Sequence, residues 1–588
     1  RKIAKERGFK ALEHAGLKTA LEAKKLVTII CDAPINFSFG TAEFGGLDLL
    51  KIKNTFLKYD FHSLIKRLSG VTPNKTDESS SEKSPPKTQV KIEPPSPQTE
   101  ILLISKNTGL PKWLKTPPKT LGLCIHEGFG GLFDATKELE IGSGDNSARI
   151  DESALSQIKN TLSDQKIEKV CFQTKNILHL LSNVGLHLEN AADDIALMGY
   201  LLEAGAETVD LQMLCRRHLG HAETSARALP PLRDILRTEL RQQNMEKLYD
   251  QIELPLIRVL FAMEQRGILI DSSYLKELSA KLSGRRDRLE QEIMKQAGLT
   301  FNVNSPQQIA QVLFEKLGIS SKGLKKTKTG ISTAAPELEK IIDKHPIIQL
   351  IFNERELQKL LSTYINVLPT LADKSGRIHT TYEQAITSTG RLSSVNPNLQ
   401  NIPIQSELAD EIRRAFIAPP GYDLIAADYS QMQLRIAASI TRDKNMLSAF
   451  KRGEDIHTAT ASHIFGIEPK DVTKAMRRQA KVINFGILYG MGANALARGA
   501  EMSVAEAREF IIKYFAAHPG IRMYMEETKL RAISQGYVET LFGRRRSFPE
   551  ITSGIPFVRS AAERMAINMP IQGTEADIMK MAMIAVAQ

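Results

Sequence analysis

The chain has 588 residues, and its 78 Lys and Arg exceed its 67 Asp and Glu to give a formal net charge of +11. At about 150 residues per domain this length predicts roughly four domains. The content of hydrophobic residues, 42%, suffices for several cores, so a single small domain is excluded. The excess of positive charge favours a polyanionic partner such as nucleic acid, without specifying one.

The four cysteines lie far apart and include no Cys-x-x-Cys pair, which argues against a disulfide framework and against a structural zinc site. We therefore expect a reducing cytoplasm as the compartment. The apolar runs fall far short of the about 18 residues needed to span a bilayer, so no membrane partner is expected. The cysteines are Cys31, Cys124, Cys171 and Cys215.

Both ends of the sequence suggest a fragment. Residue 1 is Arg rather than Met, and the last residues form the apolar, helix-favouring run DIMKMAMIAVAQ without a Gly or Pro stop signal. We therefore expect a chain cut at both ends.

Residues 73–98 predict a flexible linker, because six Pro and five Ser coincide there with very few large apolar residues. The linker separates a head, residues 1–72, from the rest. After it, the strand-like runs ILLIS, TLGLCI and KVCF alternate with amphipathic stretches, which predicts an α/β domain. From about residue 230 onward, long helices and motif-like loops predominate.

The polar loop at residues 387–405, TSTGRLSSVNPNLQNIPIQ, is rich in planar hydrogen-bonding side chains. Such side chains suit the base edges and phosphates of nucleic acid. Loops are polar in general, so this signal is weak in isolation.

Residues 423–440 carry a first candidate site. The run LIAA predicts a buried strand that ends at Asp428, whose carboxylate, with the backbone carbonyl of Tyr429, could hold Mg²⁺. The alternative is structural. Ser430 and Gln433 have the spacing of a capping box, and an Asp at the end of a strand is usually a turn residue.

Residues 476–490 carry a second candidate site on a predicted helix. Cations and aromatics recur there at every fourth position and form one stripe. Like charges at this spacing repel, and a triphosphate on the cations with a base against the aromatics would explain them. The alternative is an amphipathic helix whose aromatics enter the core while its cations reach solvent. The stripe consists of Arg477, Lys481, Phe485 and Tyr489.

Taken together and in this order, these segments resemble family A DNA polymerases of the bacterial DNA polymerase I type. The resemblance extends over essentially the whole chain and is dense from 250 to 580. Further matching segments are LPLIRVLFAMEQRGILID (254–271), GRIHTTYEQAITSTGRLSS (376–394), EDIHTATA (454–461), GYVETLFGRRR (536–546) and AAERMAINMPIQGTEADIMK (561–580).

The resemblance implies an α/β multidomain fold. An RNase H-like domain of the 3′-5′ exonuclease type is expected at 99–245, followed by a right-hand polymerase domain at 246–588. Within the latter, the thumb is expected at about 275–370 and the fingers at about 441–588, with palm pieces before and after the thumb. The head at 1–72 resembles the C-terminal end of the family's 5′-nuclease domain.

The resemblance also implies roles for single residues. Asp428 would be the first of two catalytic carboxylates and would bind Mg²⁺ together with the Tyr429 carbonyl, the complete enzyme using two ions. Primer-template DNA and dNTPs would be the partners of a monomeric enzyme. Lys481 would also take part in catalysis. The residues expected to contact the dNTP are Tyr429, Gln433, His457, Arg477, Lys481, Phe485 and Tyr489. The residues expected to contact DNA are Arg391, Asn398, Gln400 and Gln572.

Three departures from the family pattern stand out. Gln433 occupies a position where the family usually has Glu, which predicts somewhat weaker exclusion of ribonucleotides. No His-Asp-Glu, the family's motif for the second metal-binding carboxylate, occurs in the 588 residues, so we expect this chain to lack half of its metal site.

The exonuclease motifs depart as well. The first strand, taken as LLISKNTGL, has Ile104 and Lys106 in place of acids. The second motif has Gln173 and Ile177, and the third has no match. We expect a retained fold without proofreading. Asp193 and Asp194 are better explained by helix capping.

Two rival functions stay open at this point. A non-catalytic DNA-binding scaffold would fit a naturally truncated chain. A template-dependent RNA polymerase fits less well, because the bulk of Gln433 and Tyr489 favours deoxynucleotides.

Overall fold

The computed structural model describes residues 101–127, 137–203, 209–327, 330–404 and 407–588. The chain divides into two compact units, Arg1–Lys91 and Ile92–Gln588, and the described residues all belong to the second. The expected head at 1–72 and linker at 73–98 lie outside the described residues. Among the described helices, none is long and apolar enough to cross a membrane.

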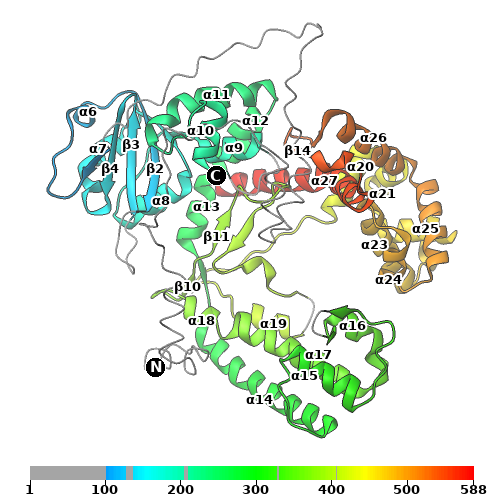
Figure 1. The fold of residues 1–588 in the computed structure, drawn as a ribbon. Helices are drawn as coiled ribbons and strands as arrows, with labels where there is room; N and C mark the ends of the chain where they lie inside the picture. The colour runs from blue at the N-terminus through cyan, green and yellow to red at the C-terminus, as the bar shows by residue number, and fades with distance from the viewer. Residues whose placement is uncertain (1–100, 128–136, 204–208, 328–329, 405–406) are drawn as a thin grey trace, which may run out of the picture. The chain divides into compact units, whose positions relative to one another are not determined.

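A six-stranded mixed sheet in the order β1-β4-β3-β2-β5-β6 forms the core of the expected α/β domain (Figure 1). Strands β2, β3 and β4 are antiparallel neighbours, whereas β5 and β6 continue parallel to β2. The predicted α/β class is thereby confirmed, although β2, β3 and β4 follow one another with no described helix between them. The strands are β1 (Leu102–Ile104), β2 (Thr120–Glu127), β3 (Lys137–Ser143), β4 (Asn146–Asp151), β5 (Glu168–Cys171) and β6 (Ala191–Asp194).

Helices pack on this sheet because their apolar faces match its buried side chains. Leu232, Leu236 and Leu240 recur at helical spacing along α11 and are fully buried. The helical elements of this part are α6 (Lys112–Lys115), η2 (Glu152–Ile158), α7 (Lys159–Ser163), α8 (Thr174–Asn183), α9 (Ile195–Leu202), α10 (Leu211–His218), η3 (Ala226–Ala228) and α11 (Leu229–Gln242).

The expected first strand is not the central one. Strand β1, which holds Ile104, lies at the edge of the sheet and pairs only with β4. The strand between the antiparallel β3 and the parallel β5 is β2. The comparison of Ile104 and Lys106 with the acids of the family's first strand stays a prediction, since a short apolar run does not reveal its place in a sheet.

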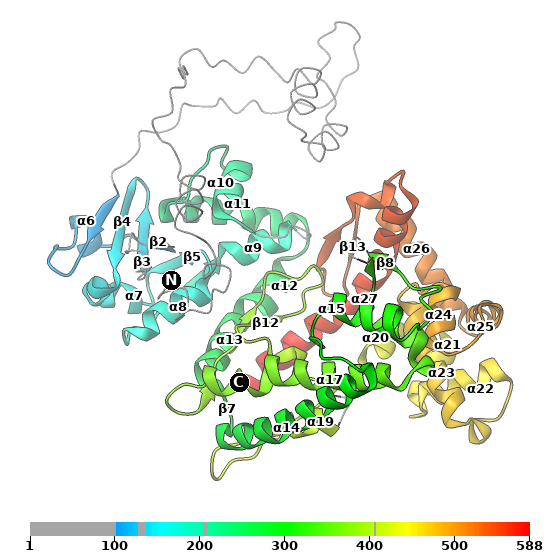
Figure 2. The ribbon, with the colours of Figure 1, turned by 60° about the horizontal axis from the view of Figure 1, so that its bottom comes forward.

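A long antiparallel helix pair follows, α14 (Ser272–Ala297) and α17 (Pro346–Leu360), which run side by side in Figure 2. Helix α14 begins where the Asp271 carboxylate accepts a hydrogen bond from the Tyr274 amide over 2.8 Å. It ends at Gly298, which adopts the left-handed conformation with φ 62°. The elements around the pair are α12 (Glu246–Leu248), η4 (Tyr249–Glu253), α13 (Leu254–Arg266), α15 (Pro306–Ala310), η5 (Gln311–Lys316), α16 (Ala335–Leu338), η6 (Glu339–Lys344), η7 (Leu361–Ile365) and α18 (Leu368–Leu371).

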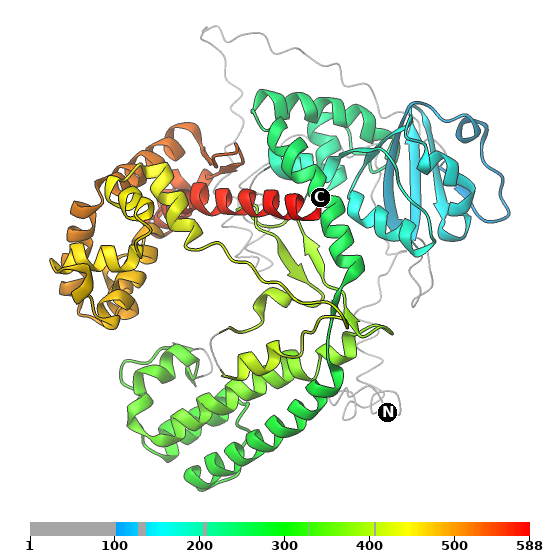
Figure 3. The same cartoon turned by 180° about the vertical axis from the view of Figure 1, so that it is seen from behind.

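A second helical cluster is formed by the last third of the chain, with its own apolar core (Figure 3). The long C-terminal helix α27, drawn in red, packs against α13, α20 and α26. Its helical elements are α20 (Met432–Thr441), α21 (Lys444–Lys451), α22 (Ile456–Phe465), η9 (Pro469–Asp471), α23 (Lys474–Leu488), α24 (Ala493–Gly499), α25 (Val504–Ala517), α26 (Pro519–Gln535), η10 (Pro549–Thr552) and α27 (Pro556–Ala587). Two further elements, η8 (Leu399–Asn401) and α19 (Glu407–Arg413), pack instead in the core of the α14–α17 pair.

Four two-stranded ladders connect these helices. All four are antiparallel, and their strands are only two or three residues long. They pair β7 (Ile268–Leu269) with β10 (Arg377–Ile378), β8 (Lys326–Thr327) with β9 (Gly330–Ile331), β11 (Thr381–Glu383) with β12 (Ser393–Val395), and β13 (Tyr537–Glu539) with β14 (Arg545–Ser547).

The buried strand expected before Asp428 is not formed. The run is extended but belongs to no ladder, and Ile425 is 93% exposed. A strand needs a neighbour for its backbone hydrogen bonds, and an apolar sequence alone does not supply one. The capping box was wrong too, because α20 begins at Met432 after Gln431, whose side chain makes no capping bond.

Candidate active site

Helix α23 carries the predicted stripe. It begins where the Thr473 hydroxyl accepts a hydrogen bond from the Met476 amide over 3.2 Å. Its inner face, which includes the fully buried Ile483, packs into the core of the second helical cluster. Arg477 and Lys481 lie on the opposite face and are exposed, so the helix and the direction of its cations are as predicted.

The aromatic half of the stripe lies at the edge of the core rather than inside it. Phe485 and Tyr489 are half-buried, and their rings stack with centroids 6.4 Å apart. The His457 ring, on α22, lies 5.9 Å from that of Phe485. Phe485 packs against the core of the second helical cluster, as the structural alternative expects, but it is only partly buried there.

His457 is buried, and burial lowers the pKa of its imidazole, with Arg477 and Lys481 acting in the same direction against Asp455. The Asn484 amide lies 3.1 Å from His457 Nδ1 and can donate to it, which leaves the ring proton on Nε2. His457 is thus suited to donate a hydrogen bond as a neutral ring, not to provide a positive charge.

A cleft of ≈ 760 Å³ lies between α20, α23, α27 and the 391–400 loop, and it gathers half of the predicted site residues. Asp428 and Tyr429 line it, and both are exposed. The predicted residues that line the cleft are Arg391, Gln400, Asp428, Tyr429, Gln433 and Phe485, whereas Asn398, His457, Arg477, Lys481, Tyr489 and Gln572 lie outside its lining.

Glu575 of α27 is a site residue that the sequence reasoning missed. Its carboxylate accepts a hydrogen bond from the Gln433 amide over 2.9 Å and forms an ion pair with Arg391. Burial raises the pKa of the Tyr489 hydroxyl, and a hydrogen bond with Gln572 opposes this rise. The signal was present in the QGTEAD segment, where Gln572 and Glu575 are three residues apart on one helix face.

The loop that carries Arg391 is held by its own polar side chains. Asn398 accepts a hydrogen bond from the Gln400 amide over 3.0 Å, and the Gln400 side chain donates to the Leu392 carbonyl over 3.3 Å. Gly390 has φ 82°, and a Cβ added there would lie 2.5 Å from Arg544 Nε. Glycine is therefore required where the loop passes Arg544.

A buried ionic network fixes α27 beneath the cleft. Glu253 accepts hydrogen bonds from Lys580 over 2.7 Å and from Arg544, and all three side chains are buried. Arg544 also donates to Asp577 over 2.8 Å. Burial lowers the pKa of Lys580 to about 8, in spite of the opposing effect of Glu253. Because Asp577 and Lys580 follow Glu575 by two and five residues on α27, the network holds that part of the helix in place.

Asp428 and the Tyr429 carbonyl offer oxygen donors, which suit Mg²⁺ better than softer metals. Among the described residues, only one group of three His, Cys, Asp or Glu ligand atoms lies close enough to share an ion, and Asp428 is not in it. Asp428 thus presents one exposed carboxylate to the cleft.

The two acids kept in the exonuclease-type domain have structural partners. Asp194 caps α9 by accepting from the Leu197 amide over 3.1 Å, and it also accepts from the Thr174 amide over 2.6 Å. Capping is therefore confirmed for Asp194. Asp193 instead forms an ion pair with Arg237.

Comparison with known proteins identifies the family to which the chain is similar. The family model "DNA polymerase family A" matches residues 272–588, and "DNA polymerase I, ribonuclease H-like domain" matches residues 143–224. The solved structure of the POL domain of Pol1 from M. smegmatis, in complex with DNA primer-template and dNTP, is 35% identical with a TM-score of 0.74. That match covers 81% of this chain and 87% of the other.

Curated relatives give the same result. The chain is 45% identical over 417 residues to "DNA polymerase I, thermostable" of Thermus caldophilus, a match that covers 70% of this chain and 50% of that protein. It is 36% identical over 598 residues to "DNA polymerase I" of Geobacillus stearothermophilus, covering 96% and 65%. The chain thus spans about half the length of the first of these relatives and about two thirds of the second. The chain belongs to DNA polymerase family A, with a ribonuclease H-like domain of the DNA polymerase I type.

Proposed function

We propose that the chain acts in template-directed DNA synthesis, in replication and repair, by adding deoxynucleoside monophosphates to a primer 3′-hydroxyl with release of pyrophosphate. The observation that carries the proposal is that Asp428, Phe485 and Arg391 line one cleft. The similar M. smegmatis domain was solved with DNA primer-template and dNTP, which supports the same ligands here.

The incoming dNTP would lie along α23. Arg477 and Lys481 present two exposed positive charges one helical turn apart, which suits a triphosphate. The stacked rings of Phe485 and Tyr489, farther along the same stripe, would contact the base and sugar. His457 would donate a neutral N–H to a phosphate oxygen.

Asp428 and the Tyr429 carbonyl would hold Mg²⁺ through oxygen ligands. In the complete enzyme two such ions would lower the pKa of the primer 3′-hydroxyl and offset charge on the phosphates. The His-Asp-Glu motif that would supply the second metal-binding carboxylate does not occur in the 588 residues. The protein's own share is to place the carboxylate in the cleft with Phe485 and to hold the triphosphate through the α23 cations, so that the reacting groups meet in line.

Arg391 and Gln572 would read the shape of the newly formed base pair. Every correct pair presents acceptors at similar places in the minor groove, so donors placed there detect misfit without reading sequence. Asn398 and Gln400 order the loop that carries Arg391 and would contact the DNA backbone.

We further propose that the exonuclease-type domain has no proofreading activity. That chemistry needs clustered carboxylates for two metal ions. Asp193 and Asp194 are engaged in an ion pair and a helix cap, and Gln173 and the buried Ile177 provide no acid. We also propose that the two domains span residues 99–245 and 246–588, and that the protein is a monomer located in the cytoplasm.

Primer extension tests this function. The 588-residue chain and the full-length product of its gene are each incubated with a labelled primer-template, Mg²⁺ and either the matched dNTP or a mismatched one. Addition of the matched nucleotide by the full-length product supports the proposal. DNA binding without extension by either protein would favour a scaffold and overturn it.

A further inference from the structure

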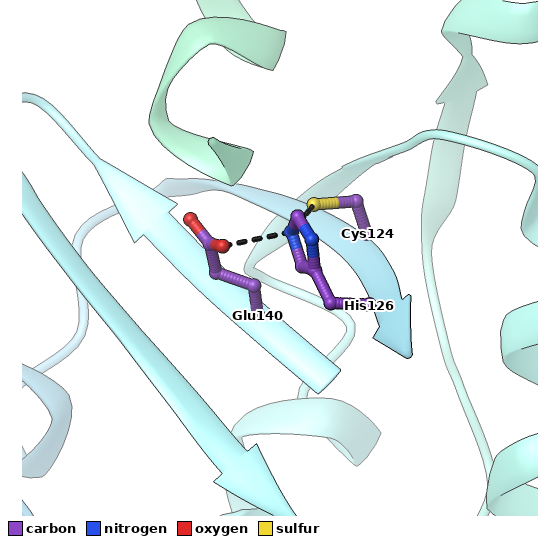
Figure 4. Close-up of side chains that lie close together, drawn as sticks. All are labelled: Cys124, His126 and Glu140. Atoms are coloured by element: carbon purple, nitrogen blue, oxygen red, sulfur yellow. Dashed lines mark hydrogen bonds and ion pairs between the residues drawn. The ribbon is translucent and has the colours of Figure 1, made fainter. Parts of the chain in front are cut away.

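The sheet of the ribonuclease H-like domain assembles three metal-binding side chains on one face. Cys124 on β2 and Glu140 on β3 are directly opposite partners in the antiparallel register, and His126 follows Cys124 by two residues. Side chains alternate along a strand, so these three point to the same face. Figure 4 shows them converging. Cys124 Sγ lies 3.3 Å from His126 Nε2, which lies 2.8 Å from Glu140 Oε2.

We propose that Cys124, His126 and Glu140 bind a zinc ion. A thiolate, an imidazole and one carboxylate form a donor set that favours Zn²⁺ over Mg²⁺. Tetrahedral bonds of about 2.0 Å to N and O and about 2.3 Å to S separate the ligand atoms by about 3.3 and about 3.5 Å. The observed 2.8 and 3.3 Å require shifts of only a few tenths of an ångström.

The carboxylate is oriented by surrounding donors, as metal ligands usually are. Arg149, the cross-strand partner of Glu140 on β4, donates from Nε to Oε2 over 3.0 Å. The Ala226 amide donates to Oε1 over 3.0 Å, and the hydroxyls of Ser147 and Ser225 donate to the same oxygen. Glu140 is fully buried, and these bonds fix its position while Oε2 stays directed at His126.

Two glycines build the site by letting η3 approach the sheet. Gly122 and Gly142 face each other in β2 and β3, two pairs before Cys124 and Glu140, so both pairs lie on the same face. A Cβ on Gly122 would lie 1.8 Å from the Ala226 carbonyl oxygen, and one on Gly142 would lie 2.3 Å from the Arg227 amide nitrogen. Only glycine at both positions brings the Ala226 amide within reach of Glu140.

Binding replaces protons by the ion. The Cys124 S–H bond breaks and its proton goes to solvent, while His126 loses its proton from Nε2 and is protonated at Nδ1 instead. Three bonds form, from zinc to sulfur, nitrogen and oxygen, and the Oε2 bond from Arg149 is kept. The His126 side chain is 19% exposed, which leaves an entry and a fourth position for water.

The sequence argument against a structural zinc site considered only Cys-x-x-Cys pairs. It therefore overlooked Cys124, whose partners are a histidine and a glutamate. The strand register brings in Glu140, sixteen residues away along the chain. Within the part of the chain that the structure describes, this is the only group of three such ligand atoms.

The test uses Co²⁺ as a spectroscopic probe of the full chain, with Zn²⁺ as competitor. We expect one Co²⁺ per chain with a thiolate-to-cobalt charge-transfer band that Zn²⁺ abolishes. Cys124→Ala should remove the band, and His126→Ala should weaken binding at least tenfold. Cys171→Ala is the matched control, because Cys171 is a buried cysteine of the same sheet that pairs with Leu123 and points to the other face.

Absence of the band in the unaltered chain, or its persistence in Cys124→Ala, would overturn the proposal. Loss of the band in Cys31→Ala would also overturn it, because the thiolate would then lie elsewhere. Circular dichroism checks that each variant is folded. If Cys124→Ala fails to fold, the Co²⁺ affinity of His126→Ala provides the test, because His126 is partly exposed. An unchanged affinity in that variant would contradict the site.

Discussion

The side-chain amide of Gln433 donates a hydrogen bond to the Glu575 carboxylate over 2.9 Å. The same carboxylate pairs with Arg391, so α20 and the polar loop are joined through α27. Tyr489 has Gln572 as its hydrogen-bonding neighbour. Position 433 is therefore linked to Arg391 through Glu575, whereas Tyr489 is linked to Gln572.

Gln433→Glu should destabilise this contact. It replaces a donor by a second carboxylate facing Glu575, and two such charges about 4 Å apart repel by about 1 to 4 kcal/mol depending on the effective dielectric constant. Arg391 offsets part of that repulsion, so we expect a modest fall in the thermal unfolding temperature. The double variant with Glu575→Gln should restore it, and an unaltered melting curve for the single variant would contradict the observed bond.

The same substitution tests sugar selection. The family's usual Glu at this position predicts that Gln433→Glu excludes ribonucleotides more strongly than the natural chain does. The ratio of dNTP to rNTP incorporation by the full-length gene product measures this. Equal ratios for the two proteins would show that Gln433 has no such effect.

Removing either exposed cation of α23 should weaken dNTP binding. A hydrogen bond to a charged group contributes about 1.5 to 3 kcal/mol, so Lys481→Ala should raise the apparent dNTP dissociation constant about tenfold to a hundredfold. Arg477→Ala should act in the same direction and also release Asp455 from its ion pair. Titration of the binary DNA complex with a fluorescent dNTP gives the constants.

Arg478 provides the matched control. It lies on the same helix but outside the stripe, is exposed, and pairs with Glu501 over 2.6 Å. Arg478→Ala should leave dNTP affinity within about twofold, because exposed ion pairs contribute little. Equal losses in the Lys481 and Arg478 variants would indicate that only the overall charge of the helix matters.

The buried network around Glu253 should dominate the stability of the α27 region. Glu253→Gln removes the charge shared by Arg544 and Lys580, and breaking a buried pair costs about 3 to 5 kcal/mol. Glu526→Gln, in the exposed pair with Arg522, should cost about 0.5 kcal/mol or less. Urea unfolding followed by circular dichroism compares the two; similar costs would contradict the network's role.

Acid should destabilise the chain through two buried carboxyls. Burial would raise the pKa of Glu253 and Glu140, but Lys580 and Arg544 around the first, and His126 and other donors around the second, hold each pKa at about 2, below the ordinary 4.5. The unfolded chain therefore binds more protons as the pH falls from 4.5 toward 2. Their contribution is complete above pH 4.5 and is lost below it.

Calorimetric melting temperatures between pH 7 and 3 measure this effect. They should stay nearly constant down to about pH 5 and then fall. In Glu140→Gln the fall should be smaller, since a neutral amide takes up no proton. Parallel curves for the two proteins would assign the acid sensitivity to other groups.

Sequence patterns predicted the local features of this site well. The period of α23 placed Arg477 and Lys481 on an exposed face, and Asp194 caps a helix as its position before an apolar run suggested. These predictions succeed because helix faces and caps depend on neighbours within about four residues.

Features that depend on distant partners could not be predicted in the same way. The apolar run before Asp428 looked like a strand, but strand formation requires a paired neighbour, and Ile425 is exposed. Glu575 reaches Gln433 from 142 residues away, and Glu140 meets Cys124 only through the sheet register. Tertiary pairing of this kind leaves no periodic signal in the sequence.

The most direct test of the proposed active site is single-nucleotide incorporation by the full-length gene product carrying Asp428→Asn. Asp423→Asn is the matched control, because Asp423 is an exposed acid five residues earlier in the same extended segment. We predict that Asp428→Asn lowers the rate about a thousandfold or more, equivalent to about 4 kcal/mol in the barrier, with Asp423→Asn within about twofold of the natural rate. Incorporation by Asp428→Asn at the rate of the control would contradict the assignment of this cleft as the active site.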